Sequence, residues 1–443
     1  MARVAVENLG PFRSCSFELR PLTVIIGRNS VGKSMLLYLL WSVMSLPPVP
    51  GDLEVSAADL AKAVAERVSR GVDPSEAFRE LLRAYVRAFP KASARALEER
   101  LAGVFGVSPR ELLLKGSERG RIVVEGDRGA VEFVVSGDGV EARYLYIDEG
   151  LVDRYEVVVP APGRLAVRLG GETMGEDYVA GVVDAALMAT AVLADFTVRT
   201  LRPFFASELL CVLLVDSRAG IARTLLKAFV DPSVVKGLSH ADEHFIRLYY
   251  RLAEELARGD VDLSLAEPLL RELGVEVVPV LERAAYRLRV RTWTGHEVPF
   301  ELAPSGAREA LTTALALSAK YFPCVFIEEP EAHLHPRAQK AMARLIAKSV
   351  NAGKRVVVST HSDYIVYTLN NLIALSKVAE RAQDLGYGRG EVLRPEAVAA
   401  YLVKQGEGVA EVVRLEVGEE GFDESTFAEV VRELADERAF ISL

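Results

Sequence analysis

Cysteine, glutamine and asparagine are scarce in this chain of 443 residues. The three cysteines, Cys15, Cys211 and Cys324, lie far apart and form no Cys-x-x-Cys pair, which argues against a disulfide framework and against zinc. A reducing, cytoplasmic location fits this pattern. Only three glutamines and five asparagines occur, and such depletion of thermolabile amides favours a thermophilic source.

Long hydrophobic runs are also lacking. The longest apolar stretch, Val179–Phe196, is interrupted by Asp184 and Asp195, which predicts a buried helix and no membrane span. Lysine and arginine number 53 against 62 for aspartate and glutamate, so the formal net charge is −9. This balance excludes a bulk-charge binder of nucleic acid or membranes, although it leaves room for a local basic groove.

What is present is the composition of a globular protein, with 50% apolar and 26% charged residues. The length suits two or three domains, or one large domain with insertions. Residues 56–110 carry apolar side chains at spacings of three and four, which predicts helices. Short strands are expected between Arg121 and Leu169, beginning with a hairpin, and helices dominate from Ile221 to Leu273.

The final third alternates between helix and strand. Helical patterns at 306–320 and 336–349 alternate with apolar strand patterns at 324–327 and 355–359. Such alternation predicts a parallel sheet in an α/β fold. We found no internal repeat in the chain.

The strongest local signal is a G-x4-G-K-S motif between the apolar strand Leu22–Ile26 and an apolar helix, Lys33–Met44. Its glycines let the backbone wrap a phosphate at a helix N-terminus. Lys33 adds a charge for the β- and γ-phosphates, and the Ser34 hydroxyl can ligate Mg²⁺. The predicted nucleotide-binding residues are Gly27, Arg28, Asn29, Ser30, Val31, Gly32, Lys33 and Ser34.

Two acids end the predicted strand that starts at Cys324. Glu328 and Glu329 would lie at the carboxyl edge of a parallel sheet, where ligands of such folds bind. Taken alone, an acidic pair there is more often a solvated turn. Together with the phosphate loop, it predicts that Glu328 holds Mg²⁺ and that Glu329 activates the attacking water.

Two further segments point to the same edge. Ser305 and Gly306 open a helix after Pro304, so Ser305 is either a plain N-cap or a helix start that faces a γ-phosphate. Its spacing from Glu328, which leaves room for one helix and one strand, favours the second interpretation. His361 ends the strand Arg355–Ser359, and parallel pairing would bring it beside the phosphate, where it can donate to the γ-phosphate.

The ordered set GRNSVGKS, PSGARE, FIEEPEAHLHP and VVVSTHSD resembles the ABC-type ATPase heads of the RecF, structural-maintenance-of-chromosomes and overcoming-lysogenization-defect group. The chain is most similar to the stand-alone "AAA family ATPases" of that group. No Asp-x-Asp follows Asn371, so a nuclease domain is not expected. GRNSVGKS corresponds to the Walker A motif, and the Ser305–Gly306 turn to the ABC signature.

The resemblance implies ATP and Mg²⁺ as ligands and a cytoplasmic homodimer in which Ser305 and Gly306 of one copy cover the ATP of the other. It implies catalytic roles for Glu329, His361 and Lys33, and Mg²⁺ on Ser34 and Glu328. Hydrolysis would serve DNA maintenance or a defence system, and the alternative is a nucleotide-gated scaffold or regulator of a partner effector with little turnover. DNA and an unidentified effector stay open as partners, whereas a membrane does not.

The resemblance also divides the chain. An ATPase core is expected in residues 1–50, 207–230 and 275–443, which together form an ABC-type P-loop head with a mixed or parallel sheet. The predicted additions are a helical insertion at 51–115, an antiparallel β subdomain at 116–170 and a helical lobe formed by 171–206 and 231–274. The glutamine that relatives carry between the phosphate loop and the Ser-Gly motif is absent, and Asp216 and Arg218 are candidates to replace it.

Two patterns near the acidic pair have competing interpretations. His333 and His335 could form a metal pair, but the lack of a third ligand favours packing or an interface. The basic residues that follow at helical spacing could track a phosphate backbone, but the solvated face of an amphipathic helix explains them better. They are Arg337, Lys340, Arg344 and Lys348.

Overall fold

The computed structural model describes residues 2–47, 66, 70–161, 164–178, 193, 195–197, 199–200, 210–216, 218–223, 239–282, 285–423 and 425–441. The chain divides into two compact units, which we describe separately. The first unit comprises residues 1–9, 42–102 and 106–208, and the second comprises 10–41, 103–105 and 209–443. The start of the expected helical insertion and most of the apolar stretch Val179–Phe196 lie outside the described residues.

The second unit is built on a mixed sheet. In spatial order its strands are β10 (Cys211–Leu214), β14 (Cys324–Glu328), β15 (Arg355–Thr360), β3 (Leu22–Gly27), β16 (Val398–Gln405), β17 (Ala410–Leu415) and β2 (Phe12–Leu19). The strands from β10 to β16 run parallel, and β17 runs antiparallel to β16. Every residue of β3 and β14 is buried, as expected for a parallel strand covered on both faces.

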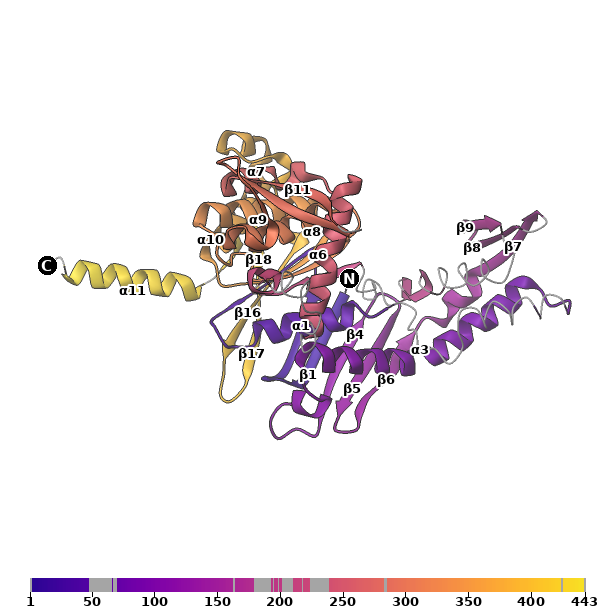
Figure 1. Cartoon of the computed structure of the whole chain (residues 1–443). Helices are drawn as coiled ribbons and strands as arrows, with labels where there is room; N and C mark the ends of the chain where they lie inside the picture. The colour runs from indigo at the N-terminus through magenta and orange to yellow at the C-terminus, as the bar shows by residue number, and fades with distance from the viewer. Residues whose placement is uncertain are drawn as a thin grey trace. The chain divides into compact units, whose positions relative to one another are not determined.

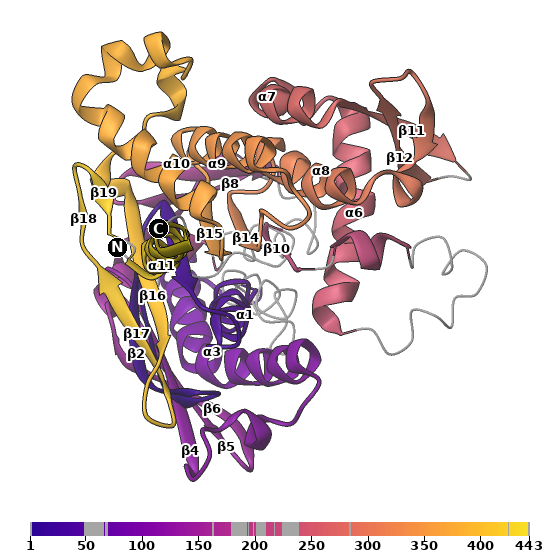
Figure 2. The same ribbon diagram turned by 90° about the vertical axis from the view of Figure 1, so that its left-hand side faces the viewer.

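Helices cover both faces of these parallel strands. Figure 2 shows α8 (Ser305–Ser318), α9 (Pro336–Asn351) and α10 (Asp363–Ala374) side by side on one face, with α1 (Lys33–Met44) on the other. The connection from β14 through α9 to β15 is a βαβ unit of the kind that the alternating pattern predicts. The predicted fold class, an α/β P-loop ATPase head with a mixed sheet, is confirmed.

A smaller antiparallel sheet completes the second unit. It is formed by β11 (Val275–Glu282), β12 (Ala285–Thr292) and β13 (Glu297–Pro299). Tyr249 on α6 (His240–Arg258) ties this sheet to the helix, because its hydroxyl accepts a hydrogen bond from the Leu288 N–H at 3.1 Å. The helix α7 (Leu263–Leu273) ends at Gly274, whose φ of 63° forms a left-handed cap before β11.

The remaining elements of the second unit lie before α8 or after α10. They are the 3₁₀ segments η4 (Phe300–Leu302, before α8), η5 (Leu375–Leu385), η6 (Arg389–Glu391) and η7 (Pro395–Ala397), the short strands β18 (Val417–Gly418) and β19 (Gly421–Phe422), and the terminal helix α11 (Ser425–Ile441). Within the described residues, no helix combines the length and apolar character that crossing a membrane requires.

The first unit combines strands with one long helix (Figure 1). The strands β1 (Ala2–Leu9), β4 (Arg119–Glu125), β5 (Gly129–Ser136) and β6 (Gly139–Ile147) pair antiparallel in that order. The helix α3 (Pro74–Phe105) starts at the N-cap Asp73, whose side chain accepts the Glu76 N–H, and it ends at Gly106. The apolar residues that predicted this helix are buried, namely Phe78, Leu81, Leu82, Tyr85, Val86 and Phe89.

A separate three-stranded sheet in the first unit differs from the expectation at one point. Its strands are β7 (Tyr155–Ala161), β8 (Arg164–Leu169) and β9 (Glu172–Tyr178), with the 3₁₀ segments η1 (Pro109–Leu112) and η2 (Glu149–Arg154) earlier in the chain. A helical lobe was expected from residue 171, yet β9 is a strand. The reason is Gly170-Gly171, whose φ values of 60° and 90° form a hairpin turn that returns the chain along β8.

Candidate active site

The candidate site lies at the carboxyl edge of the parallel strands in the second unit. Thr360 pairs with Ile26, and Ser359 pairs with Glu328, so β3, β14 and β15 end side by side. The phosphate loop, the acidic pair and His361 each follow one of these strands. The register therefore brings three of the four predicted motifs together, as expected at this edge of an open α/β sheet.

The phosphate loop has the backbone that its glycines predict. Gly27 and Gly32 have φ values of 146° and 103°. A Cβ on Gly27 would lie 2.1 Å from the Val403 carbonyl oxygen, and one on Gly32 would lie 2.9 Å from the Phe12 ring, so only glycine fits either position. The amides of Gly32, Lys33 and Ser34 donate no hydrogen bond to another described residue. They open α1 and are free to bind an anion.

Lys33 is buried at the start of α1. Its Nζ donates to the Arg28 carbonyl oxygen at 2.7 Å and lies 3.3 Å from Nδ1 of His361. Burial lowers the pKa of Lys33 to about 8, and the nearby carboxylates, Glu329 first among them, oppose this shift. The lysine is therefore held inside the loop beside His361, which follows β15.

Glu329 and His361 form a direct pair. Oε1 of Glu329 lies 2.8 Å from Nε2 of His361. With Lys33 in its ammonium form, Nδ1 of His361 is the acceptor, so Nε2 carries the proton and donates the hydrogen bond that Glu329 accepts. This hydrogen bond from His361 lowers the pKa of Glu329 despite partial burial, so the carboxylate is ionised near neutral pH.

The backbone at Glu329 is strained, with a φ of 43° that non-glycine residues rarely adopt. Two contacts hold it there. Its N–H donates to the Ser359 carbonyl oxygen at 2.9 Å, and its carbonyl oxygen accepts from Arg218 at 3.0 Å. Strain that is held in this way is typical of functional positions, because it aims a side chain into a site.

Glu328 is buried and points to neighbours on two other elements. Its Oε2 accepts from the Tyr38 hydroxyl at 2.6 Å and from the Asp216 N–H at 2.8 Å. Its Oε1 accepts no hydrogen bond from a described residue and is available to a cation. Burial and the Glu328 carboxylate hold the pKa of Tyr38 far above its usual range, so the phenol remains a donor.

Arg218 cannot replace the glutamine of the relatives. It is fully buried, and its guanidinium donates to the carbonyl oxygens of Glu328 at 2.7 Å and Glu329 at 3.0 Å. Its Nε also lies 3.0 Å from Oε2 of the buried Glu309 on α8. Arg218 is thus a structural link that holds the end of β14, and the suggestion that it reaches the phosphate site is wrong.

Ser305 lies apart from these contacts. The N-cap interpretation is wrong, because Pro304 with its fixed φ occupies the cap position and Ser305 is the first helical residue, without a side-chain cap. Ser305 is exposed. Gly306 lies against the turn after the acidic pair, since a Cβ there would come within 2.9 Å of the His333 carbonyl oxygen. Among the described residues, no hydrogen bond or ion pair joins Ser305 to Lys33, Glu329 or His361.

Three of the neighbouring histidine and basic side chains make structural contacts, namely His335, Arg344 and Lys348. His335 is the N-cap of α9 and accepts the Arg337 N–H. Within the part of the chain that the structure describes, no cluster of three His, Cys, Asp or Glu could hold a metal ion. Arg344 and Lys348 both pair with the buried Glu391, at 2.9 and 3.4 Å, so two of the four basic residues on α9 are held in ion pairs with one acid.

Tyr38, Glu309 and Glu331 have no role in the motif-based prediction. Each acts through a contact that bridges distant parts of the sequence, such as Tyr38 to Glu328 or the Glu331 carboxylate to the His361 N–H. Only Glu331 had a local signal, since it lies inside the acidic segment after β14.

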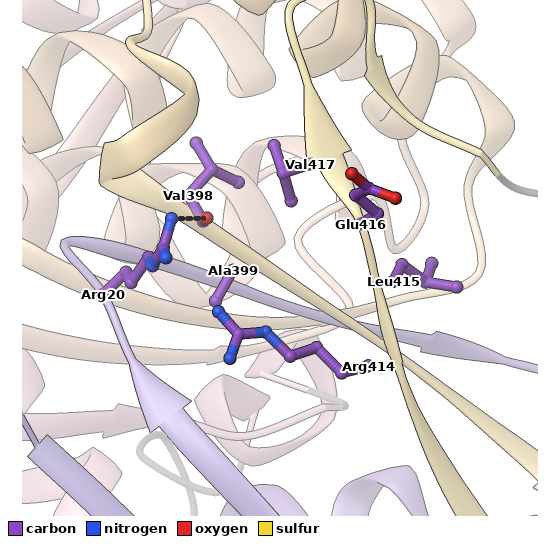
Figure 3. A pocket seen from close by; sticks show the side chains of 7 residues that line it. All are labelled: Arg20, Val398, Ala399, Arg414, Leu415, Glu416 and Val417. Atoms are coloured by element: carbon purple, nitrogen blue, oxygen red, sulfur yellow. Dashed lines mark hydrogen bonds between the residues drawn. The ribbon is translucent and has the colours of Figure 1, made fainter.

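A cavity of about 350 Å³ elsewhere in the second unit contains none of these residues. Figure 3 shows that Arg20 and Arg414 both point into it, beside Val398 at the amino end of β16. Each of the two guanidinium groups is paired with Glu18, at 3.2 and 2.6 Å, so the carboxylate offsets their charge. This cavity offers no chemistry that adds to the site at the opposite edge of the sheet.

Comparison with known proteins agrees with the site. Residues 268–366 match the family model of the AAA ATPase domain. The match spans Ser305, Glu328, Glu329 and His361, and it supports the resemblance to AAA family ATPases. A domain of this family implies nucleotide binding. A sequence comparison with curated proteins finds no match.

Three solved structures are similar to the whole chain at low identity. A Smc head bound to the C-terminal winged-helix domain of ScpA is 13% identical, with a TM-score of 0.45 over 94% of this chain and 98% of that one. A Smc head with an extended coiled coil, bound to the C-terminal domain of ScpA from Pyrococcus furiosus, is 13% identical, with a TM-score of 0.45 over 99% and 100%. The Smc head domain from Thermotoga maritima is 12% identical, with a TM-score of 0.38 over 94% and 98%.

Proposed function

We propose that this protein hydrolyses ATP in a Mg²⁺-dependent reaction. The observation that carries the proposal is the chain of contacts from Lys33 through His361 to Glu329, beside the amides of residues 32–34, which donate no hydrogen bond to another described residue. One edge of the sheet thus carries Lys33 as a cation for phosphates, His361 as a hydrogen-bond donor and Glu329 as a carboxylate base. These are the components that phosphoryl transfer to water requires.

Each residue has a distinct role in this proposal. The amides of the loop and Lys33 bind the β- and γ-phosphates. Glu329 accepts a hydrogen bond from the attacking water and aligns it with the γ-phosphate, and His361 orients the Glu329 carboxylate through its Nε2–H. Strain at Glu329 and its low pKa keep the carboxylate aimed and ionised for this step.

The residues present fit a magnesium ion. Ser34 is exposed at the start of α1, and Oε1 of the buried Glu328 accepts no hydrogen bond from a described residue. Mg²⁺ needs few protein ligands in such sites because phosphate oxygens and water complete its shell. When bound, it would neutralise charge on the phosphates.

The exposed Ser305–Gly306 turn supports a homodimer in which each copy covers the nucleotide of the other. Within one chain this turn makes no contact with the catalytic residues, whereas its helix start is accessible and offers N–H groups. The process that hydrolysis serves, DNA maintenance or defence, remains a prediction from the resemblance.

The decisive experiment replaces Glu329 with glutamine, which keeps its size and removes the base. Parent protein should release phosphate from Mg-ATP, and Glu329→Gln should bind ATP yet lose at least about a hundredfold in kcat. On a sizing column with ATP, this variant should elute as a dimer. Lys33→Ala is the matched control, because it should fail to bind ATP and should stay monomeric.

Two results would overturn the proposal. Parent protein that leaves Mg-ATP intact over hours would show that the site is a nucleotide-gated scaffold. Glu329→Gln with the turnover of the parent would show that another group activates the water.

A further inference from the structure

A third acid, Glu331, links the two strand ends that carry the proposed catalytic pair. It follows β14 by three residues, and its Oε1 accepts the N–H of His361 at 2.6 Å. His361 in turn contacts Glu329 through Nε2 at 2.8 Å and Lys33 through Nδ1 at 3.3 Å. Glu331 therefore fixes the backbone of the one residue that both catalytic side chains touch.

The surroundings of the Glu331 carboxyl group lower the stability of the fold. Its Oε2 is buried and has no hydrogen-bond partner among the described residues, although a contact of the carboxyl group with the Thr360 side chain favours the ionised form. Burial raises the pKa of this carboxyl group. A buried polar oxygen without a protein partner lowers stability, so a role at the site would be a reason for its presence.

The geometry supplies such a reason. The position of the His361 imidazole depends on the direction in which the backbone leaves β15. Among the described residues, the backbone N–H of His361 donates one hydrogen bond, and Glu331 accepts it. Without it, the turn after Thr360 loses one of its links to the residues that follow β14. A shift of about 1 Å in such a group can cost on the order of a hundredfold in rate.

We propose that Glu331 is a positioning residue for hydrolysis, which holds His361 against Glu329 through the hydrogen bond to the His361 N–H. This inference rests on the proposed ATPase function. It assigns no contact between Glu331 and the nucleotide, so the effect of its loss must pass through His361.

A pair of substitutions separates the acceptor from the size of the side chain. Glu331→Gln keeps a carbonyl oxygen for the His361 N–H, and Glu331→Met fills a similar volume without an acceptor. We expect the Gln variant to stay within about threefold of the parent kcat and the Met variant to lose about ten- to a hundredfold, with the KM for ATP changed less than about threefold in both.

The route through His361 is tested by a double substitution. If Glu331 acts only by positioning His361, then Glu331→Met should reduce kcat little further, within about twofold, in a His361→Ala background. Effects that multiply would mean that Glu331 acts on the site by another path and would overturn the proposal. Thermal unfolding of each variant shows whether it is folded, and Glu331→Ala replaces the Met variant if that one is not.

The outcomes also separate this inference from the proposed function. If the parent does not hydrolyse ATP, the proposed function fails. If the parent does and Glu329→Gln does not, but Glu331→Met keeps the kcat of the parent, the positioning role alone is wrong.

Discussion

Three acids lie at the end of β14 and in the three residues after it, and each has different surroundings. Glu328 is buried with a phenol and an amide on one oxygen, Glu329 is paired with His361, and Glu331 is buried with one oxygen unpaired. Such differences set the direction of each carboxylate and the groups that it can bind. Chemically identical side chains can thus hold a cation, activate water and position a neighbour.

Tyr38 gives the first prediction at this scale. Its hydroxyl lies 2.6 Å from Oε2 of Glu328, so it orients the carboxylate proposed to hold Mg²⁺. Removing an orienting partner of a metal ligand typically costs about ten- to a hundredfold in metal affinity. We expect Tyr38→Phe to raise the Mg²⁺ concentration for half-maximal turnover by about tenfold, measured by titrating Mg²⁺ at saturating ATP.

The matched control is Tyr364→Phe, because Tyr364 is a 54% exposed tyrosine on α10. It should leave the Mg²⁺ dependence of the parent unchanged. A Tyr38→Phe variant with the same Mg²⁺ dependence as this control would show that Glu328 is oriented without the phenol, or that it holds no metal.

At the scale of elements, the end of β14 is tied to two neighbours by Arg218. The guanidinium joins the carbonyl oxygens of Glu328 and Glu329 to Glu309 on α8, and both charged side chains are fully buried. Glu309 also accepts the Ala219 N–H at 2.8 Å. This arrangement connects the helix that starts at Ser305 to the strand end that carries Glu329.

We expect Arg218→Met to lower the free energy of unfolding by about 3–5 kcal/mol, because it leaves the Glu309 charge buried and unpaired. Guanidinium unfolding followed by circular dichroism measures this loss. The double variant Arg218→Met/Glu309→Leu removes both charges and should recover part of it. Equal stability of the Met variant and the parent would mean that the buried pair is not formed.

Prediction from sequence succeeded where a local pattern determines the structure. The glycines of the phosphate loop, the buried runs of β3 and β14 and the spacing of α3 all have local causes. The strand β2 was missed because Arg13 and Ser14 are both exposed, which breaks the alternation of a half-buried strand. The hairpin β16–β17 has a local signal in the sequence, the turn residues Gly406 and Gly408.

The missing parts of the site have a different explanation. Arg218 and Glu331 act through hydrogen bonds to residues 110 and 30 positions away along the chain, and no local pattern encodes such a contact. Their chemistry is visible in the sequence, but their partners are set by the order of strands in the sheet. The sequence suggested that Arg218 lies near the phosphate. Its structural role became visible only once the order of the strands was known.

At the scale of the whole molecule, the proposal makes one chain insufficient for hydrolysis. Lys33, Glu329 and His361 meet within one copy, whereas Ser305 is exposed and would complete the site of a second copy. In a head-to-tail dimer, each of two equivalent sites takes its loop from one subunit and its signature turn from the other. This arrangement can be tested without a structure of the dimer.

Two inactive variants should therefore restore each other. Lys33→Ala removes the loop lysine, and Ser305→Arg blocks the turn with a large cation, so each variant alone should lack turnover. Each mixed dimer has one intact site, so an equal mixture should recover turnover, up to about half of the parent activity if only mixed dimers form. Phosphate release from the mixture at a concentration that supports dimers measures this recovery. If the mixture stays inactive while each variant is folded, the Ser305 turn serves its own subunit or none; if Ser305→Arg alone hydrolyses ATP like the parent, the turn has no part in the reaction.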